Sequence, residues 1–194
     1  MITTEQIKEL RDATGISVMQ CKKALEEAGG VMEKALIILR KKGGDIAAKK
    51  ADRTLGAGVI AAYIHGNGSV GAMVELSCET DFVAKNEEFK TLAYDIAMHV
   101  AASNPTYLKA ADVGEVDKEK VKEVFVKDVA GKPAAIQEKI MQGKLAAYFG
   151  EKTLLEQPFI KNPDLTIQGL LDSGIQKFGE KIAVARFTRF SVLG

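Results

Sequence analysis

Tryptophan is absent from this 194-residue sequence, and cysteine, histidine and proline are scarce, with two, two and four residues. The two thiols, Cys21 and Cys78, lie far apart and cannot supply the ligands of a structural zinc site. No apolar run reaches the roughly 18 residues of a membrane span, and the opening residues, MITTEQIKEL, lack the basic and then apolar layout of a signal peptide. These absences favour the reducing cytosol, and we expect a cytoplasmic location with no membrane partner.

An excess of charge of either sign is also lacking, because 27 lysines and arginines nearly cancel 26 aspartates and glutamates. Such a balance creates no global field that would concentrate the protein on nucleic acid or on an anionic membrane. Any charged partner must therefore meet a local patch. The hydrophobic fraction of 46% in a chain of this length is enough for one or two globular domains with their own cores.

The N-terminal part of the chain carries three short helical patterns. Capping boxes at Thr3–Gln6 and Ser17–Gln20 begin the first two patterns. Glycines at Gly15, Gly29–Gly30 and Gly43–Gly44 end the three. Apolar residues recur at helical spacing within each: Ile7, Leu10 and Ala13, then Cys21, Ala24, Leu25 and Ala28, then Ala35, Leu36, Ile38 and Leu39. A bundle of about 40 residues is marginal alone, so we expect a recognition module attached to a larger domain.

Residues 40–53, RKKGGDIAAKKADR, hold six basic and two acidic side chains. We interpret them as a solvated, partly helical linker. A contact with nucleic acid is the alternative, but no aromatic residue interleaves the charges to stack on bases. We therefore divide the chain into residues 1–55, a three-helix module plus basic linker, and residues 56–194, a core domain.

After the linker the apolar period changes from helical to two. Runs rich in β-branched residues at 58–65 and 69–78 flank Gly66–Gly68, which predicts a β-hairpin. Residues 180–193 alternate again and predict a third strand of an antiparallel sheet. Helical patterns cover residues 86–103, 117–129 and 133–148. The fold class predicted for the core is α+β, a three-stranded antiparallel sheet packed with helices.

Several catalytic motifs are tested and rejected. Residues 66–71 match G-x-G-x-x-G, but a strand follows them where a dinucleotide site needs a helix. The P-loop pattern of GTPases does not occur. Cys21 and Cys78 fall on apolar stripes, as small buried thiols do. We interpret His99 as a packed or surface residue, whereas His65 closes a strand and is either a partner contact or a plain turn residue.

The segment Glu79–Asn86 joins a predicted strand to a predicted helix, and Phe82 and Val83 lie at its centre beside Asp81. Exposed connections usually carry polar residues, so an aromatic here needs an explanation. Two interpretations stay open. Phe82 either tucks into the core beneath the loop or protrudes as an aromatic wedge held by a rigid sheet and helix.

Three segments resemble the signatures of one family. LRDATGISVMQCKKALEEAGG at 10–30, LSCETDFVAKNEEF at 76–89 and LLEQPF at 154–159 look like the N-terminal, central and C-terminal signatures of elongation factor Ts. The resemblance spans essentially the whole chain and is closest to the short bacterial type. It implies a three-helix module similar to ubiquitin-associated domains, a flexible basic connector and an α+β core.

The function implied by the resemblance is guanine-nucleotide exchange on elongation factor Tu during translation elongation. A member of this family binds the GDP form, displaces magnesium and promotes GDP release. It makes or breaks no bond, so we expect no enzyme activity, no cofactor and no metal site, because the magnesium belongs to the partner. We expect no direct contact with nucleic acid.

The resemblance also implies particular site residues. Thr80, Asp81, Phe82 and Val83 match the segment that disturbs the partner's magnesium site. Phe82 would insert between side chains near that site, and Asp81 would make polar contacts beside it. Further contacts are implied for Lys8 and Lys22 with the GTP-binding domain of elongation factor Tu, and for His65, Phe159 and Ile160 with its third domain.

The predicted sheet has apolar residues on both faces, because Val59 and Tyr63 alternate with Ile60 and Ile64. One face would stay uncovered by the chain's own helices. Pairing two copies sheet to sheet would cover it, so we expect a homodimer that forms a two-to-two complex with its partner.

Three alternatives stay open. The first is a nucleic-acid-binding protein that uses the basic linker and the three-helix bundle. The second is a small cytosolic enzyme built on His65, Asp81 and Cys78. The third is a generic ubiquitin-like adaptor.

Overall fold

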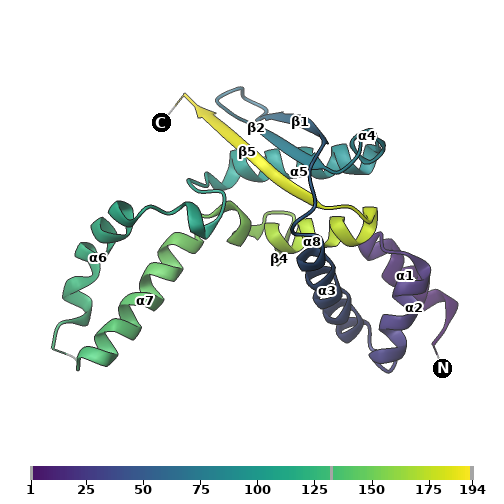
Figure 1. Ribbon diagram of the computed structural model, residues 1–194, viewed down its shortest axis with the longest axis horizontal. Coiled ribbons are helices and arrows are strands. Elements are labelled where there is room, and N and C mark those ends of the chain that lie inside the picture. The colour runs from purple at the N-terminus through teal and green to yellow at the C-terminus, as the bar shows by residue number, and fades with distance from the viewer. Residues whose placement is uncertain (1, 132, 193–194) are drawn as a thin grey trace.

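The computed structural model describes residues 2–131 and 133–192 (Figure 1). The chain forms a small sheet packed with helices, a helical module at one end and a projecting pair of helices at the other. The elements in chain order are α1 (Thr4–Thr14), α2 (Val18–Glu27), α3 (Met32–Lys49), β1 (Ala57–Ile64), β2 (Val70–Cys78), α4 (Asp81–Ala84), α5 (Glu87–Ser103), η1 (Ala110–Asp112), α6 (Glu115–Val129), α7 (Ala134–Gly150), η2 (Leu154–Glu156), β3 (Pro158–Phe159), β4 (Asn162–Thr166), α8 (Ile167–Phe178) and β5 (Ile182–Ser191).

The main sheet is antiparallel with the strand order β1-β2-β5. The turn between β1 and β2 is closed by the N–H of His65, which donates to the carbonyl of Val70 at 2.8 Å, and Gly68 has a φ of 71°. That left-handed conformation is the reason for glycine here. The predicted hairpin, third strand and α+β class are confirmed, although Leu193 of the predicted strand lies outside the described residues.

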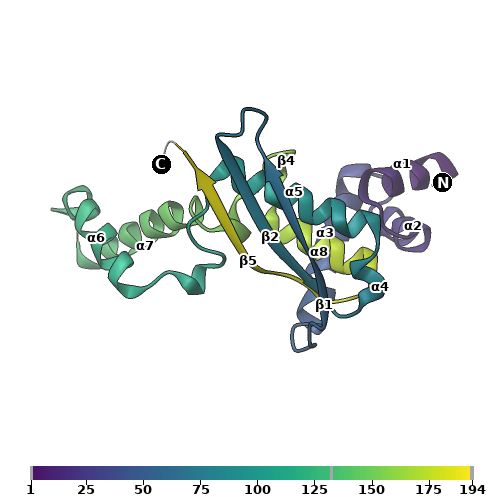
Figure 2. The ribbon, with the colours of Figure 1, turned by 90° about the horizontal axis from the view of Figure 1, so that it is seen from above.

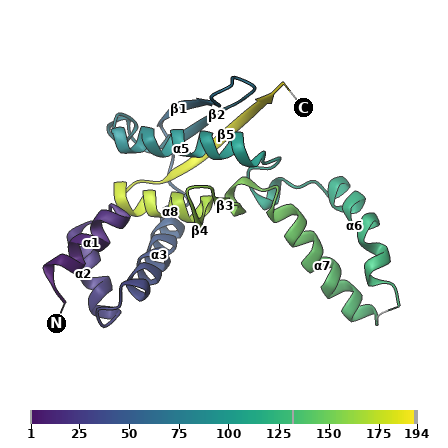
Figure 3. The same ribbon diagram turned by 180° about the vertical axis from the view of Figure 1, so that it is seen from behind.

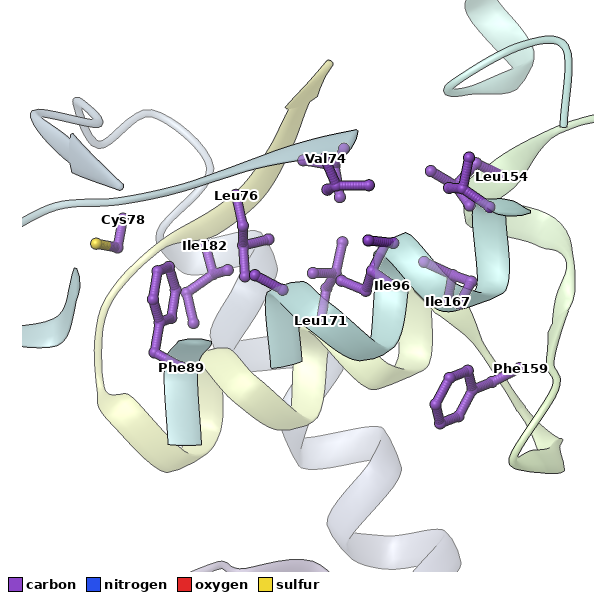
Figure 4. Close-up of a cluster of buried hydrophobic side chains, with 14 of the residues drawn as sticks. Val74, Leu76, Cys78, Phe89, Ile96, Leu154, Phe159, Ile167, Leu171 and Ile182 are labelled. Atoms are coloured by element: carbon purple, nitrogen blue, oxygen red, sulfur yellow. The ribbon is translucent and has the colours of Figure 1, made fainter. Parts of the chain in front are cut away.

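The core lies between the sheet and the helices α5 and α8 (Figures 1 and 3). Alternate residues of β2 point inward, and the apolar stripe of α5 and the inner face of α8 meet them (Figure 4). The fully buried side chains include Val74, Leu76, Phe89, Ile96 and Ile167, each 0 or 1% exposed. Burying each one stabilises the fold by about 1.5–3 kcal/mol. In the part of the chain that the structure describes, no helix covers the opposite face of the sheet (Figure 2).

The three N-terminal helices enclose a second, smaller core around Leu10, Cys21, Leu25 and Leu39. The predicted capping box at Thr3–Gln6 is confirmed in both directions, with bonds of 3.0 and 3.2 Å. At the second helix only half of the predicted box forms, since Ser17 accepts from the N–H of Gln20 at 3.4 Å. Gly15 ends α1 with a φ of 67°.

The helix α3 continues past Gly43–Gly44 to Lys49, so the predicted end at these glycines is wrong. The reason is a tertiary contact with α8. A Cβ atom on Gly43 would lie 3.2 Å from Oε1 of Gln176 and 3.3 Å from the carbonyl oxygen of Asp172. Because glycine lacks that atom, the two helices approach closely, and their packing outweighs the low helix propensity of glycine.

The basic segment 40–53 is partly helical and lies largely at the surface, as expected from the sequence, but it is anchored to the rest of the chain and is not a flexible connector. Ile46 and Ala47 pack against the main core. Four of the six basic side chains are engaged within the chain: Arg40 donates to the carbonyl of Asp164 at 3.1 Å, Lys42 pairs with Glu27 at 2.6 Å, Lys50 donates to the carbonyl of Gly179 at 2.8 Å, and Arg53 pairs with Glu79 at 3.2 Å. The contacts of Arg40, Lys50 and Arg53 join the helical module to the core, whereas the pair of Lys42 with Glu27 lies within the module.

The helices α6 and α7 form an antiparallel hairpin that projects from the rest of the molecule (Figures 1 and 2). Both were predicted from the sequence. They are held together by an edge-to-face contact of Phe125 and Tyr148, with ring centroids 6.3 Å apart, and by a 2.7 Å pair of Lys144 and Asp128. Within the described parts of the chain, no helix is long and apolar enough to span a lipid bilayer.

Candidate functional site

The segment between β2 and α5 is a single helical turn, α4, where the sequence suggested an irregular loop. Successive residues of a helix point in different directions, and here they divide between solvent and core. Phe82 is 81% exposed, whereas Val83 is 4% exposed and belongs to the main core. The structure thus excludes the interpretation in which Phe82 tucks under the loop. Val83 therefore supports the segment of residues 79–86, called the corner below, from inside the core. Its own side chain is not accessible to a partner.

Two carboxylates clamp the corner to the start of β5. The N–H groups of Glu79 and Thr80 donate to Oε2 of Glu180 at 3.1 and 3.0 Å, and the hydroxyl of Thr80 donates to its Oε1 at 2.6 Å. In the other direction, the N–H of Lys181 donates to Oε1 of Glu79 at 2.5 Å. Bonds to charged acceptors are stronger than neutral ones, so this reciprocal clamp stiffens the base of α4.

Glu79 also links the corner to the end of the basic segment, because its carboxylate accepts two 3.2 Å bonds from Arg53. Its pKa is lowered, chiefly by the hydrogen bond from the N–H of Lys181 and then by Arg53. Glu79 therefore stays ionised, and the clamp is intact, at neutral pH.

Asp81 stands beside Phe82 on the exposed side of the corner. Its carboxylate pairs with Lys85, one turn later, at 2.6 Å, and this bond lowers the pKa of Asp81. Both side chains are about three-quarters exposed. Exposed pairs of this kind contribute little to stability, so Asp81 can exchange Lys85 for a partner's group at low cost.

Cys78 lies directly beneath the corner, 0% exposed, and its thiol donates to the carbonyl of Thr80 at 3.2 Å. Burial raises the pKa of the thiol, so it stays protonated. Cys78 pairs with Ala57 at one end of the β1-β2 hairpin, and His65 follows the other end. Eight residues of strand separate them by about 25 Å. An enzyme site built on Cys78, Asp81 and His65 is therefore contradicted.

His65 lines an apolar groove at that far end of the sheet. The groove has a volume of about 410 Å³ and is lined by Tyr63, His65, Val70, Met98, Ala101, Ala102, Ile160 and Arg189. The hydroxyl of Tyr63 lies 3.1 Å from Nδ1 of His65. Two of the residues singled out in the sequence, His65 and Ile160, thus come together although 95 positions separate them.

Of the neighbours Phe159 and Ile160, one side chain is buried and the other is exposed, as for Val83 and Phe82. Phe159 is 5% exposed and belongs to the core (Figure 4). Its ring centroid lies 6.2 Å from that of His99. Ile160 is 41% exposed and faces the groove. In this structure the surface at this point is therefore formed by Ile160, with Phe159 beneath it.

Lys8 and Lys22 are both exposed, on α1 and α2. Lys22 lies 3.9 Å from Glu26, a loose pair at the surface. Figures 1 and 3 place α4 at the same end of the molecule as α1 and α2. The module and the core are tied by Gln176, which donates to the side chain of Gln20 at 2.6 Å. The two lysines and the corner are thus carried by one connected body.

The sequence did not single out Glu180, Glu79 or His99 as functional residues. The clamp joins positions about 100 residues apart, and nothing local distinguishes Glu180 from any acidic residue before a strand. His99 stands on a helix beside an apolar stripe, and only its hydrogen bonds in the folded chain reveal a special environment. No local signal could have found these residues.

A protruding aromatic on a stiffened corner and an apolar groove at the far end of the same sheet are features of a protein that acts by binding another protein. Among residues 2–131 and 133–192, no group of three or more histidine, cysteine, aspartate or glutamate side chains could hold a metal ion. The class defined by the fold and the site is thus a protein-binding factor.

Comparisons with known proteins give the family. The family model described as Elongation factor TS matches residues 3–193. Elongation factor Ts of Carboxydothermus hydrogenoformans is 53% identical over 194 residues, which cover 99% of this chain and 89% of the relative. Elongation factor Ts of Acetivibrio thermocellus is 52% identical (98% and 89% covered), and that of Thermodesulfovibrio yellowstonii is 51% identical (98% and 96% covered). The chain belongs to the elongation factor Ts family.

Proposed function

We propose that this protein is a guanine-nucleotide exchange factor that binds the GDP form of elongation factor Tu and inserts Phe82 near the partner's magnesium site. Membership of the elongation factor Ts family supports the exchange role in general. The observation that carries the finer mechanism is the 81% exposure of Phe82 on a clamped helical turn. Thr80 and Asp81 flank the wedge, and the cytoplasm is the expected location.

The mechanism is a linkage of two binding equilibria. GDP and magnesium bind elongation factor Tu in one arrangement, and the exchange factor binds better to another arrangement in which the metal and phosphate contacts are broken. Each ligand then weakens the other by the same factor. No bond is made or broken in this process, so the protein is a binding factor and not a catalyst of a chemical reaction.

The stiffness of the corner favours this mechanism. Because the backbone at Phe82 is already held in place, only the rotations of its side chain remain to be ordered on binding. Transfer of a phenylalanine side chain from water to an apolar site is worth about 1.5–3 kcal/mol. That free energy is available to oppose the metal contacts of the partner, and it corresponds to a factor of about 10 to 100 in the exchange equilibrium.

The test is the release of fluorescent GDP from purified elongation factor Tu in the presence of the wild-type protein or Phe82→Ala. We expect the variant to lose most of the stimulation while its free energy of unfolding changes by less than about 0.5 kcal/mol, because Phe82 has few contacts to lose. Val124→Ala is the matched control, since Val124 is 71% exposed on α6 and far from the corner. Equal stimulation by all three proteins would remove the wedge from the mechanism.

The remaining contacts are part of the same proposal. Lys8 and Lys22 would meet the GTP-binding domain of elongation factor Tu from the same end of the molecule as Phe82. His65 and Ile160 would receive its third domain in the apolar groove. Phe159, being buried, would shape this surface from beneath.

We also propose a homodimer that binds two copies of elongation factor Tu. The uncovered sheet face exposes Ile60 (63%), Ile64 (66%), Met73 (44%) and Phe190 (68%). A contiguous apolar face of this kind is unusual on a monomer, and a second copy would offer the same face in return. Equilibrium sedimentation should give a dimer for the wild-type protein and a monomer for Phe190→Asp. A monomeric wild-type protein at micromolar concentration would contradict this.

A nucleic-acid-binding function is less well supported. The basic residues of segment 40–53 that are engaged in internal contacts, among them Lys50 and Arg53, cannot release counterions from a phosphate backbone without breaking those contacts. The proposed protein partner needs no such rearrangement.

A further inference from the structure

His99 lies in the last turns of α5 and is 0% exposed, which makes it a fully buried imidazole between that helix and the segment Gln157–Ile160. The N–H of Ile160 points at its Nδ1 at 3.3 Å, and Oε1 of Gln157 lies 2.9 Å from its Nε2. A backbone N–H can only donate, so Nδ1 must accept. The proton of the neutral ring therefore resides on Nε2 and is donated to Gln157.

Gln157 is itself fixed. Its Nε2 donates to the carbonyl of Glu151 at 2.7 Å, which orients Oε1 toward His99. Each partner thus determines the direction of the next bond in the order Ile160, His99, Gln157, Glu151. The chain of bonds is complete only when the imidazole is neutral.

The bond from Ile160 matters because of where this residue lies. Ile160 occupies the turn between the short strands β3 and β4, and its side chain lines the groove with His65. The strands pair only through Pro158 with Thr166 and Phe159 with Asn162, so the turn has little support of its own. The bond to His99 anchors the backbone of Ile160 to α5, whose Met98 and Ala101 line the same groove, and the neighbouring side chain of Lys161 pairs with Asp95 of the same helix.

We propose that His99 is a positioning residue: its neutral imidazole holds Ile160 at the groove, and protonation releases Ile160 and weakens the binding of elongation factor Tu. This inference rests on the proposed function. His99 does not touch the partner and acts only through the backbone of Ile160.

Protonation breaks the bond because it places a hydrogen on Nδ1, opposite the N–H of Ile160. Two donors then face each other in a buried site. The hydroxyl of Ser103, 3.5 Å from Nδ1, can accept from the protonated ring, whereas the N–H of Ile160 loses its acceptor. Burial lowers the pKa of His99 below 6.5, and the bond to Gln157 opposes this shift. The neutral form is accordingly the resting form at neutral pH.

The charged groups on the surrounding elements are already engaged. Asp95, one turn earlier on α5, pairs with Lys161 at 2.7 Å. Arg189 of β5 donates to the carbonyl of Ala101 at 3.0 Å, and Glu151 contributes its backbone carbonyl. Burial is the largest cause of the lowered pKa of His99, and the bond to Gln157 opposes it.

The sign of the pH effect follows. We call the bond from the N–H of Ile160 to neutral His99 the latch. Because the pKa of His99 is lowered on folding, the unfolded chain binds more protons below about pH 6.5. The state with the latch formed therefore loses stability as the pH falls through that value. Below the pKa of His99 the neutral fraction falls about tenfold per pH unit. Above about pH 7 the latch contributes no pH dependence.

The test uses two substitutions, each of which replaces the imidazole by an amide that can take the place of one of its two ring nitrogens. In His99→Asn, the amide oxygen can take the place of Nδ1 and accept from Ile160. In His99→Gln, the longer amide takes the place of Nε2 and loses that acceptor. Neither side chain titrates near neutral pH, so both variants separate the latch from every other pH-dependent group, including His65.

We expect the affinity of the wild-type protein for elongation factor Tu to fall by about fivefold, relative to His99→Asn, between pH 7.5 and the pH at which NMR shows His99 to be protonated, the effect of losing one hydrogen bond of about 1 kcal/mol. His99→Gln should be weaker than His99→Asn at every pH. Parallel pH profiles for the wild-type protein and His99→Asn, once His99 is seen by NMR to titrate within this range, would overturn the proposal.

A second measurement needs no partner and no variant. In the free wild-type protein, NMR should show that the protection factor of the Ile160 amide, which is the intrinsic exchange rate at each pH divided by the observed rate, falls as the His99 imidazole becomes protonated, with one common midpoint. An Ile160 amide indifferent to that titration would overturn the latch even if the exchange function is established. A failure of nucleotide exchange with an intact latch would instead refute the proposed function.

Discussion

Substitution of Glu180 by alanine tests whether the wedge must be held stiffly. The change removes both carboxylate oxygens that accept from Glu79 and Thr80. A buried hydrogen bond to a charged group contributes about 1.5–3 kcal/mol, but Thr80 is exposed and water can replace part of each bond. We therefore expect a loss of about 1–2 kcal/mol in the free energy of unfolding, measured by urea denaturation.

The effect on nucleotide exchange follows from the same loss of about 1–2 kcal/mol. If 1–2 kcal/mol no longer favours the clamped corner, the population of correctly placed Phe82 falls by at most about 5- to 30-fold. Stimulated release of fluorescent GDP should fall within that limit. Glu180→Gln is the matched control, because its amide oxygen can accept from the two N–H groups while its NH2 group donates to the hydroxyl of Thr80. It should remain close to the wild-type protein.

A double-mutant cycle gives the decisive comparison. If Glu180 acts only by placing Phe82, then Glu180→Ala combined with Phe82→Ala should be no worse in exchange than Phe82→Ala alone. Losses that add on a logarithmic scale would refute this reasoning, because Glu180 would then serve the partner by another route. Unchanged exchange in a destabilised Glu180→Ala protein would show that the corner need not be stiff.

Two further predictions concern buried small residues. Cys78→Ser should leave nucleotide exchange unchanged and lower the free energy of unfolding by about 1 kcal/mol, because serine keeps a donor for Thr80 but is more polar than the thiol; lost exchange at normal stability would revive a chemical role for the thiol. Gly43→Ala should destabilise the protein by about 1 kcal/mol, because its Cβ atom would crowd Gln176. Gly143 lies on α7, where an added Cβ atom would have no neighbour within 4 Å, so Gly143→Ala should stabilise the protein by about 0.5–1 kcal/mol. Thermal unfolding measures both glycine variants, and shifts of the same sign would contradict the close packing of α3 on α8.

The parts of the fold that were predictable from the sequence are those decided by neighbours in the chain. The cap of α1 at Thr3 and the cap of α5 at Asn86 each need only residues two or three positions away. The hairpin between β1 and β2 needs only its glycine turn and the alternating strands. The α+β class follows from these local patterns.

The parts that sequence reasoning missed depend on distant neighbours. Gly43–Gly44 has the local character of a helix end, and only the approach of α8 explains why α3 continues. The direction of Phe82 and the burial of Phe159 depend on how one turn is docked on the core. Spacing along the chain cannot decide which of two adjacent apolar residues points outward, because both choices satisfy the same pattern.

The clamp at the corner has a consequence for a chain that is still being synthesised. A ribosome adds Glu180 about 100 residues after Thr80, and domains fold as their segments become available. A nascent chain that has passed Phe82 but not yet reached Glu180 and β5 therefore carries the aromatic side chain on an untethered turn. On the proposed mechanism, the growing protein reaches its full exchange activity only after the C-terminal strand has closed the sheet.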